Sequence, residues 1–563
     1  MDKKQNYQII TERIDDIVLL LNVMKQMGLP ELINDYLPRH PNQQGLDWGW
    51  VGVIWLSYIL SQGDHRKVTV GEWVNQRRYT IEKVCGISLV ETDFTDDRLT
   101  ILLRKLSLES TWSQIERELN SNSISIYDLS VEQIRLDATT ISGHHLVSES
   151  GLFQFGHSKD DPSLAQIKVM LASLDPLGMP LATTVLSGEQ ADDGLYKPIF
   201  QQVSQNLGRL GLLWVGDCKM SSLETRGLIH SQQHYYLAPL SRVGKVPVPG
   251  LIKQWVNQAL GEVMVGQEII RVNSEGKSHQ IATAYELSRL QQISFGQEEF
   301  SWTERVLLVH SEVYQQQQQR GLEQRLKTAT EKILALTPPP GRGKRQIRDE
   351  STLQQKVQAI LKAHRLEGLL DFDYESQPPN PPRQGRYHIT AIIPNRPAIE
   401  EVQLLFGWRA YVTNAPIEKL SLHQAVLAYR DEWLVERNFG RLKGVPLSIT
   451  PFFVQRDDQV KGLVHLLSLA VRLLSLIEFV VRRRLHRTGE SLKGLYPGNP
   501  TRATTRPTTE KLLKAFDNLT LTLIQARGEW YGDVTPLNPL QSKILTFFGL
   551  SPEIYSGLVE NST

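Results

Sequence analysis

Two hydrophobic periodicities divide the chain, a helical one near its start and a strand-like one from Ser123 onward. Between Ile9 and about Asn122, apolar residues recur every three or four positions in the segments DDIVLLLNVMKQMGL, WVGVIWLSYIL and DDRLTILLRKLSLESTWSQIERELN. Prolines and glycines between these segments are typical of the ends of helices. We therefore expect an all-α N-terminal domain spanning residues 1–122.

The segment 123–224 has a different pattern, in which strands are followed by one helix. QIRLDATTISG, QIKVMLASLD and MPLATTVLSG predict three strands, and a PLG turn joins the last two. DDGLYKPIFQQVSQNLGRL then has helical spacing, and LLWVGDCKM is a short apolar strand that ends at Asp217. The order β-β-β-α-β is the outline of a ribonuclease H-like core, a mixed α/β fold whose first and fourth strands lie side by side.

The rest of the chain predicts an insertion, a second part of the core and a tail. HYYLAPL, EVMVGQEIIRV, RVLLVHSEV and RYHITAII read as strands interrupted by the Gln-rich helix YQQQQQRGLEQRLKTATEKIL, which indicates a β-rich mixed insertion over 225–404. The strand WRAYVTN and one helix, SLHQAVLAYRDEWLVERNFGRLKG, then open the second part of the core, 405–487. Residues 488–563 predict a C-terminal helical tail.

Composition restricts the class of protein only weakly. Lys and Arg total 62 against 61 Asp and Glu, so a surface for a polyanionic partner must come from local clustering. Cys85 and Cys218 are too few for a disulfide framework or a Cys-rich zinc site. The first residues lack the apolar core of a secretory signal. GLVHLLSLAVRLLSLIEFVV contains His465, Arg472 and Glu478, which are costly in a bilayer, so we expect a buried helix and no membrane partner. The low cysteine count is typical of the reducing cytoplasm, so we expect a cytoplasmic protein.

Two aspartates occupy positions where a carboxylate needs a chemical reason. Asp137 lies in the middle of the first core strand, and Asp217 closes the fourth after the apolar run LLWVG. For either residue alone, a strand-end cap or a salt bridge is a sufficient explanation. The topology, however, would place them next to each other, where two carboxylates repel unless a cation lies between them. Oxygen ligands of this kind suit Mg²⁺ or Mn²⁺, so the pair predicts a metal site.

A third carboxylate follows from the spacing of the helix that begins near Ser421. At 100° per residue, Tyr429, Glu432, Glu436 and Lys443 fall within one arc of about 60°, beside the apolar Trp433. A solvated charged face is the ordinary interpretation of such an arc. Polar groups beside Trp433, on the side of the helix expected to be buried, instead favour a site that holds metal and phosphate.

These residues carry a resemblance to a known family. Tyr429, Glu436 and Lys443 reproduce the spacing of the Tyr-Arg-Glu-Lys signature, and the chain resembles the bacterial insertion-sequence DDE transposases that bear it. The similarity runs from about Ser123 to Val480 and includes the segments FGHSKDD, LDPLGMP and SGEQADD. The helical N-terminus looks like the extra domain of a branch with long transposases. The signature's arginine contacts the transferred DNA end in the family. This chain has Glu432 at that position, with Arg430 and Arg437 nearby.

The resemblance implies cut-and-paste transposition: cleavage at terminal inverted repeats and strand transfer into target DNA. Asp137, Asp217 and Glu436 would hold two Mg²⁺ ions, with Mn²⁺ as a substitute, roughly 4 Å apart on either side of the scissile phosphate. A homodimer on double-stranded DNA is expected, because two element ends must be paired. The resemblance therefore also implies association with the nucleoid. The residues expected to contact DNA phosphates are Tyr429, Lys443, Arg430 and Arg437.

Other polar segments leave two interpretations open. His157 and Lys159, in FGHSKDD, belong either to a polar turn or to a group that positions DNA or a metal-bound water. PPPGRGKRQIR and RRRLHR, which begins at Arg482, are either solvated surface or phosphate-binding patches. The N-terminal helices could read element ends, form a dimer or serve as a scaffold.

Three other functions are compatible with parts of this pattern. A catalytically silent, transposase-derived DNA-binding protein would keep the fold, and a ribonuclease H-like nuclease would lack strand transfer. A glycosidase with paired carboxylates would not require Lys443 and Tyr429 on the helix of the glutamate.

Overall fold

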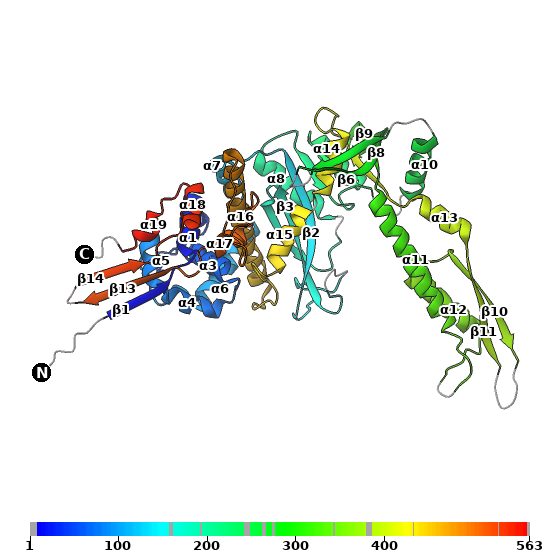
Figure 1. The fold of residues 1–563 in the computed structure, drawn as a ribbon, viewed down its shortest axis with the longest axis horizontal. Helices are drawn as coiled ribbons and strands as arrows, with labels where there is room; N and C mark the ends of the chain where they lie inside the picture. The colour runs from blue at the N-terminus through cyan, green and yellow to red at the C-terminus, as the bar shows by residue number, and fades with distance from the viewer. Residues whose placement is uncertain are drawn as a thin grey trace. The chain divides into compact units, whose positions relative to one another are not determined.

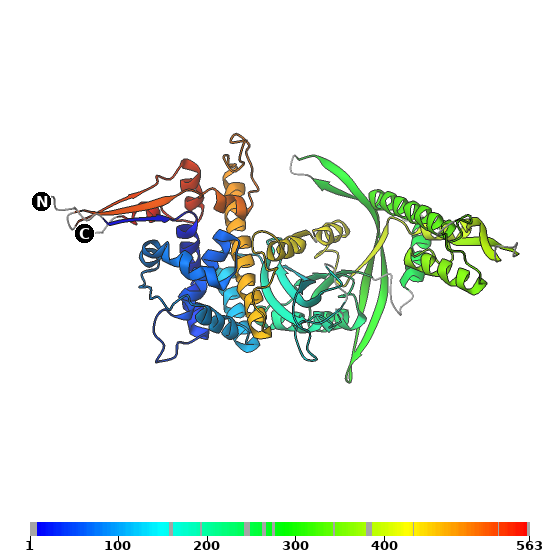
Figure 2. The same ribbon diagram turned by 90° about the horizontal axis from the view of Figure 1, so that it is seen from below.

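The computed structural model describes residues 8–156, 161–191, 194–240, 248–261, 266–272, 276–341, 344–378, 385–431, 433–526 and 529–559. The chain divides into two compact units (Figures 1 and 2). Unit 1 comprises Met1–Tyr236 and Arg430–Thr563, and unit 2 comprises Leu237–Tyr429.

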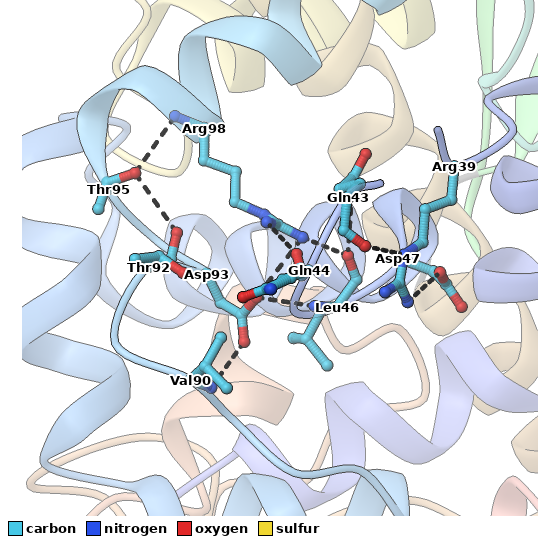
Figure 3. Close-up of polar contacts among 10 residues, drawn as sticks. All are labelled: Arg39, Gln43, Gln44, Leu46, Asp47, Val90, Thr92, Asp93, Thr95 and Arg98. Carbon is cyan, nitrogen blue, oxygen red and sulfur yellow. Dashed lines mark hydrogen bonds and ion pairs between the residues drawn. The ribbon is translucent and has the colours of Figure 1, made fainter. Parts of the chain in front are cut away.

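The N-terminal part of unit 1 is mainly helical, and the three predicted apolar segments lie in its helices, the third of them divided between two. The helices are α1 (Ile17–Gln26), α2 (Leu29–Tyr36), α3 (Trp48–Gln62), α4 (Lys67–Asn75), α5 (Arg78–Cys85), α6 (Asp96–Leu106) and α7 (Glu109–Ile126). Most of α3 is buried, because α1, α2 and α6 pack around it. The loops that flank these helices are held by polar contacts (Figure 3). Buried Asp93 accepts the backbone amides of Leu46 at 2.7 Å and Val90 at 2.8 Å, and Arg98 lies 3.5 Å from it.

The prediction of an all-α N-terminus is wrong at its first residues, and that of an all-helical tail is wrong for part of the tail. β1 (Gln8–Arg13) pairs antiparallel with β13 (Thr520–Ala526), which in turn pairs with β14 (Glu529–Val534). A six-residue strand gives little local signal, and the partner of β1 lies at the far end of the chain. The remaining tail helices are α17 (Thr509–Lys514), α18 (Pro539–Phe547) and α19 (Glu553–Ser556).

The predicted β-β-β-α-β segment is confirmed in its order and pairing. It consists of β2 (Gln133–Gly143), β3 (Ala165–Leu174), β4 (Met179–Ser187), α8 (Tyr196–Leu207) and β5 (Leu213–Gly216), followed by α9 (Leu223–Ser231). β3 is antiparallel to both β2 and β4, and β2 is parallel to β5, which gives the order β4-β3-β2-β5. The first and fourth strands are therefore neighbours, in a mixed sheet of a mixed α/β chain.

The most apolar stretch forms α16 (Asp457–Thr488), which packs against α3, α6 and β4. Within the part of the chain that the structure describes, α16 is the helix long and apolar enough to cross a membrane, but nearly all of its apolar window is buried inside the protein. The prediction that this stretch is a buried helix is confirmed. Among its buried charged groups, the Arg472 guanidinium donates to Asn120 at 2.7 Å, and the Glu478 carboxylate pairs with arginines.

Unit 2 mixes strands and helices, as predicted for the insertion, but its bounds differ from the predicted 225–404. It extends to Tyr429, so the strand at 408–413 and most of the helix at 422–430, which were predicted for the second part of the core, belong to it. Its strands β6 (Tyr235–Pro239), β12 (Trp408–Thr413), β9 (Glu298–His310), β8 (Ser278–Phe295) and β7 (Gln267–Val272) are antiparallel neighbours in this order. The other elements are α10 (Val248–Gly261), α11 (Glu312–Leu334), α12 (Glu350–Ala363), α13 (Arg396–Leu404), α14 (Leu422–Arg430) and the hairpin β10 (Leu370–Gln377) with β11 (Arg386–Pro394). A separate hydrophobic core lies among α11, α12 and this hairpin.

Candidate active site

The parallel pairing of β2 and β5 positions the two candidate aspartates. Leu136 of β2 is the register partner of Gly216 of β5, and Asp137 and Asp217 are the next residues of the two strands. Residues at matching positions of paired strands project from the same face of a sheet. Both aspartates are half-buried. The fold thus places two carboxylates at neighbouring positions where β5 ends.

Hydrogen bonds orient these carboxylates. Asp217 Oδ1 accepts the hydroxyl of Tyr196 at 2.6 Å and the backbone amide of Lys219 at 2.8 Å. Asp137 Oδ1 accepts the amide of Ala138 at 2.7 Å. Both donors are uncharged, so they fix the rotation of the Asp217 carboxylate without forming an ion pair with it.

The helix that carries Glu436 lies over the sheet face from which Asp137 projects. α15 (Trp433–Lys443) packs against β2, and its Asn438 donates to the carbonyl of Gly178 at 2.6 Å and approaches the Ser173 hydroxyl at 3.5 Å. Ser173 is the register partner of Arg135, two residues before Asp137, so these three side chains share one face. Contact with Ser173 therefore places α15 on the Asp137 face.

The single helix predicted from Ser421 to Gly444 is not observed. α14 ends at Arg430 and α15 begins at Trp433, so the spacing from Tyr429 to Glu436 cannot be read as one helical arc. Tyr429 is buried in unit 2, where its ring lies 4.6 Å from that of Tyr411, whereas Glu436 is exposed in the first turn of α15 and Trp433 is 46% exposed. No proline or glycine marks the break, so periodicity alone could not detect it.

The residues fit a divalent cation in part. Asp137 and Asp217 supply oxygen ligands of the kind that Mg²⁺ prefers, at adjacent positions. Among the residues that the structure describes, however, no three His, Cys, Asp or Glu side chains are grouped closely enough to hold a metal ion. Glu436 therefore does not complete a three-carboxylate set with the two aspartates in this conformation.

The remaining candidates for DNA contacts have different surroundings. Outside the described residues lie His157, Lys159 and Glu432, the residue at the position of the signature's arginine. Arg430 is half-buried at the end of α14, and Lys443 is half-buried at the end of α15. Contacts of these side chains with DNA stay predictions.

A buried ionic cluster around Glu478 of α16 was missed by sequence reasoning. Its carboxylate, 3% exposed, lies 2.5 Å from Arg437, 2.6 Å from Arg441 and 2.7 Å from Arg482. Arg441 also pairs with Glu510 at 2.8 Å. Because Arg437 and Arg441 belong to α15, this Glu478 cluster ties the helix of Glu436 to α16. The spacing of four residues within each of the pairs 437/441 and 478/482 was the available signal.

A second buried ion pair, also missed, lies beside the aspartates. Arg135 of β2 contacts Asp175 at 2.8 Å, and both side chains are 3% exposed. Burial raises the pKa of Asp175 above its ordinary value, although the Arg135 charge opposes the shift. Arg135, two residues before Asp137 in β2, is therefore paired with Asp175.

Comparisons with known proteins add little to this geometry. No family model matches the chain, and no curated protein matches it. Among solved structures, the chain is similar to a cryo-EM structure of a piggyBac transposase synaptic complex with hairpin DNA, with a TM-score of 0.36 and 9% identity. The match covers 90% of this chain and 81% of that chain. A likeness this weak carries no weight for the function of this chain.

Proposed function

We propose that this chain is a DDE-type DNA transposase with a ribonuclease H-like core, which cleaves DNA at element ends and joins the ends to target DNA. The observation that carries the proposal is the parallel pairing of Leu136 with Gly216, because Asp137 and Asp217 are the residues that directly follow this pair. The signature spacing of Tyr429, Glu436 and Lys443 supports it from the sequence.

Asp137 and Asp217 would hold the Mg²⁺ ions of such an enzyme, and Glu436 would join them once DNA and metal are bound. Two bound divalent ions supply a polarised scissile phosphate, an activated water or 3′-hydroxyl and a stabilised leaving oxygen. The chain's own contribution is alignment. Tyr196 and the Lys219 amide hold Asp217 in one rotation, and Asn438 holds α15 against the β3–β4 turn. Lys443 would contact backbone phosphate as a point charge.

The double-stranded DNA flanking the gene provides the substrate for the test. End-labelled duplexes from both flanks are incubated with the full chain, a target plasmid and Mg²⁺, and 3′-hydroxyl ends and joined products are resolved on denaturing gels. We expect both products, and we expect Asp137→Ala or chelation with EDTA to abolish them. Cleavage without joining would indicate a nuclease, and binding without cleavage a silent DNA-binding protein. Sedimentation of the DNA complex would test the proposed homodimer.

A further inference from the structure

Positive charge is concentrated where α16 ends. Residues 482–514 contain nine Lys and Arg against two Glu, whereas the whole chain has a net charge of only +1. Glu510 pairs with Arg441, and Glu490 pairs with Lys543, so both acids are already engaged. The exposed cations of this segment, which we call the C-terminal basic surface, are Arg484, Arg487, Lys493, Arg502, Arg506 and Lys514.

The loop that carries half of this surface is ordered by its own contacts. Leu492 and Thr504 exchange backbone hydrogen bonds of 2.9 Å, and the Gly494 amide donates to the Pro500 carbonyl at 3.0 Å. The ring of Tyr496 lies 4.1 Å from the guanidinium carbon of Arg502. A loop fixed in this way presents its charges with little entropy left to lose on binding.

The loop and the helix form one surface that reaches the helix of Glu436. Arg482 donates to the Pro507 carbonyl at 3.0 Å, which ties the loop to α16. Arg482 also shares Glu478 with Arg437, the residue after Glu436. Arg506 is close enough to Arg482 to depress its pKa, although burial is the larger cause of that shift. The Glu478 cluster therefore links the loop that carries the basic surface to α15, the helix of Glu436.

A purely structural role accounts for only part of this charge. Arg487 and His486 lie in the last turn of α16, where cations stabilise the exposed carbonyls. Lys493, Arg502 and Arg506 lie in the loop beyond the helix, outside the reach of that effect. Among the described residues, no carboxylate lies within ion-pair distance of Arg484, Arg487 or Lys493, and each of them is exposed. Exposed, unneutralised cations fit a polyanion.

Duplex DNA fits this surface better than a membrane does. Helices that lie on a membrane expose apolar residues beside their cations. Here the neighbouring apolar side chains Leu485, Leu492 and Leu495 are buried. We propose that the C-terminal basic surface binds backbone phosphates of double-stranded DNA and guides the duplex toward the turn of α15 that bears Glu436. This inference rests on the proposed function.

The test compares two triple variants of the full chain. The first, Arg484→Gln with Arg487→Gln and Lys493→Gln, removes three charges of the surface. The matched control, Lys83→Gln with Arg117→Gln and Lys356→Gln, removes three exposed charges elsewhere. Fluorescence anisotropy with a labelled duplex of arbitrary sequence is recorded between about 50 and 200 mM KCl. Thermal unfolding confirms that both variants fold like the wild type.

We expect the first variant to bind at least about tenfold more weakly, with a salt slope shallower by about three, because each lost phosphate contact removes about one unit of slope. The control should bind like the wild type. Equal affinity and slope for all three proteins would overturn the inference while leaving the proposed function intact. Absence of duplex binding by the wild type would overturn both. Loss of binding to phosphatidylserine vesicles with unchanged DNA binding would assign the surface to a membrane instead.

Discussion

Two sets of acidic side chains in unit 1 differ in what surrounds them. Glu478 is buried and faces three guanidinium groups, whereas Asp137, within β2, and Asp217, directly after β5, are half-buried. Asp217 accepts hydrogen bonds from a phenol and a backbone amide. The first arrangement neutralises a charge inside the protein and fastens two helices together. The second orients a charge at a partly open position, as a ligand for an external cation requires.

This difference separates structural acids from candidate catalytic ones. Removing one partner of a buried ion pair leaves an uncompensated charge, so the effect is on folding. Removing a carboxylate that only binds metal affects the reaction and leaves the fold nearly unchanged. The two sets should therefore respond in opposite ways to the same isosteric change.

The largest effect is expected for Asp217→Asn. The amide keeps an oxygen that can accept from Tyr196 and Lys219, so folding should be preserved, but the negative charge for the metal is lost. Mg²⁺-dependent cleavage of the labelled duplexes should fall by about a thousandfold. Asp371→Asn, on an exposed strand of unit 2, is the control and should retain activity. Cleavage within about tenfold of the wild type would remove Asp217 from the site.

Glu478→Gln should act on folding rather than directly on the reaction, because it loosens the attachment of α15. Arg437 and Arg441 would lose their shared partner, which costs about 3 kcal/mol for buried groups. Hydrogen exchange followed by mass spectrometry should show the loss as faster exchange in peptides that cover 433–443. Glu510→Gln, whose side chain is 36% exposed, should change exchange much less. Unchanged protection in the Glu478 variant would mean that the cluster does not hold α15.

His465 of α16 should have a smaller effect on stability that depends on pH. Unlike Glu478, it is buried without a group of opposite charge as its partner among the described residues. Burial lowers its pKa to about 4, and its Nδ1 lies 2.7 Å from the Leu106 carbonyl. Below pH 6.5 the unfolded state takes up the proton first, so stability falls as the pH drops from about 6.5 toward 4. Relative to His465→Phe, the wild type should lose about 2 kcal/mol between pH 6.5 and 5.

Thermal unfolding at both pH values measures this difference. Burial also raises the pKa of Asp16 to about 7, which lowers stability as the pH rises in the same window. That contribution is common to both proteins and cancels in the comparison. An equal response of the two proteins to pH would show that His465 titrates normally.

The elements that could be predicted from the sequence are those that depend on a local pattern of apolar residues. The strands around Asp137 and Asp217, their order and the helix around Glu478 follow from runs of apolar residues with a clear period. β1 was missed because β13, the strand with which it pairs, lies some 500 residues away in the chain, as in the pairing of Gln8 with Gln525. The 18-residue strand β8 was also missed, since its exposed polar residues hide the alternation.

The candidate site was predicted less completely than the fold. Two aspartates after apolar strands give a strong signal, because burial of a carboxylate needs a reason. The end of α14 at Arg430 gives no such signal, so Tyr429 and Glu436 were assigned to one helix although they belong to two. The partners of Arg437 and Arg441 come from helices more than thirty residues away, so their ionic roles depend on tertiary packing.

Arg437→Gln should have the smallest effect on stability. It tests whether an arginine of the Glu478 cluster serves only the fold or also the DNA contact. Its side chain is 22% exposed, and Arg441 and Arg482 remain beside Glu478, so the local stability of α15 should fall by at most about 1 kcal/mol. Arg441→Gln, which removes a side chain only 4% exposed, is the contrasting variant and should cost more. If Arg437 also contacts a DNA phosphate, its loss should reduce the salt slope of duplex binding by about one, whereas a purely structural arginine would leave that slope unchanged.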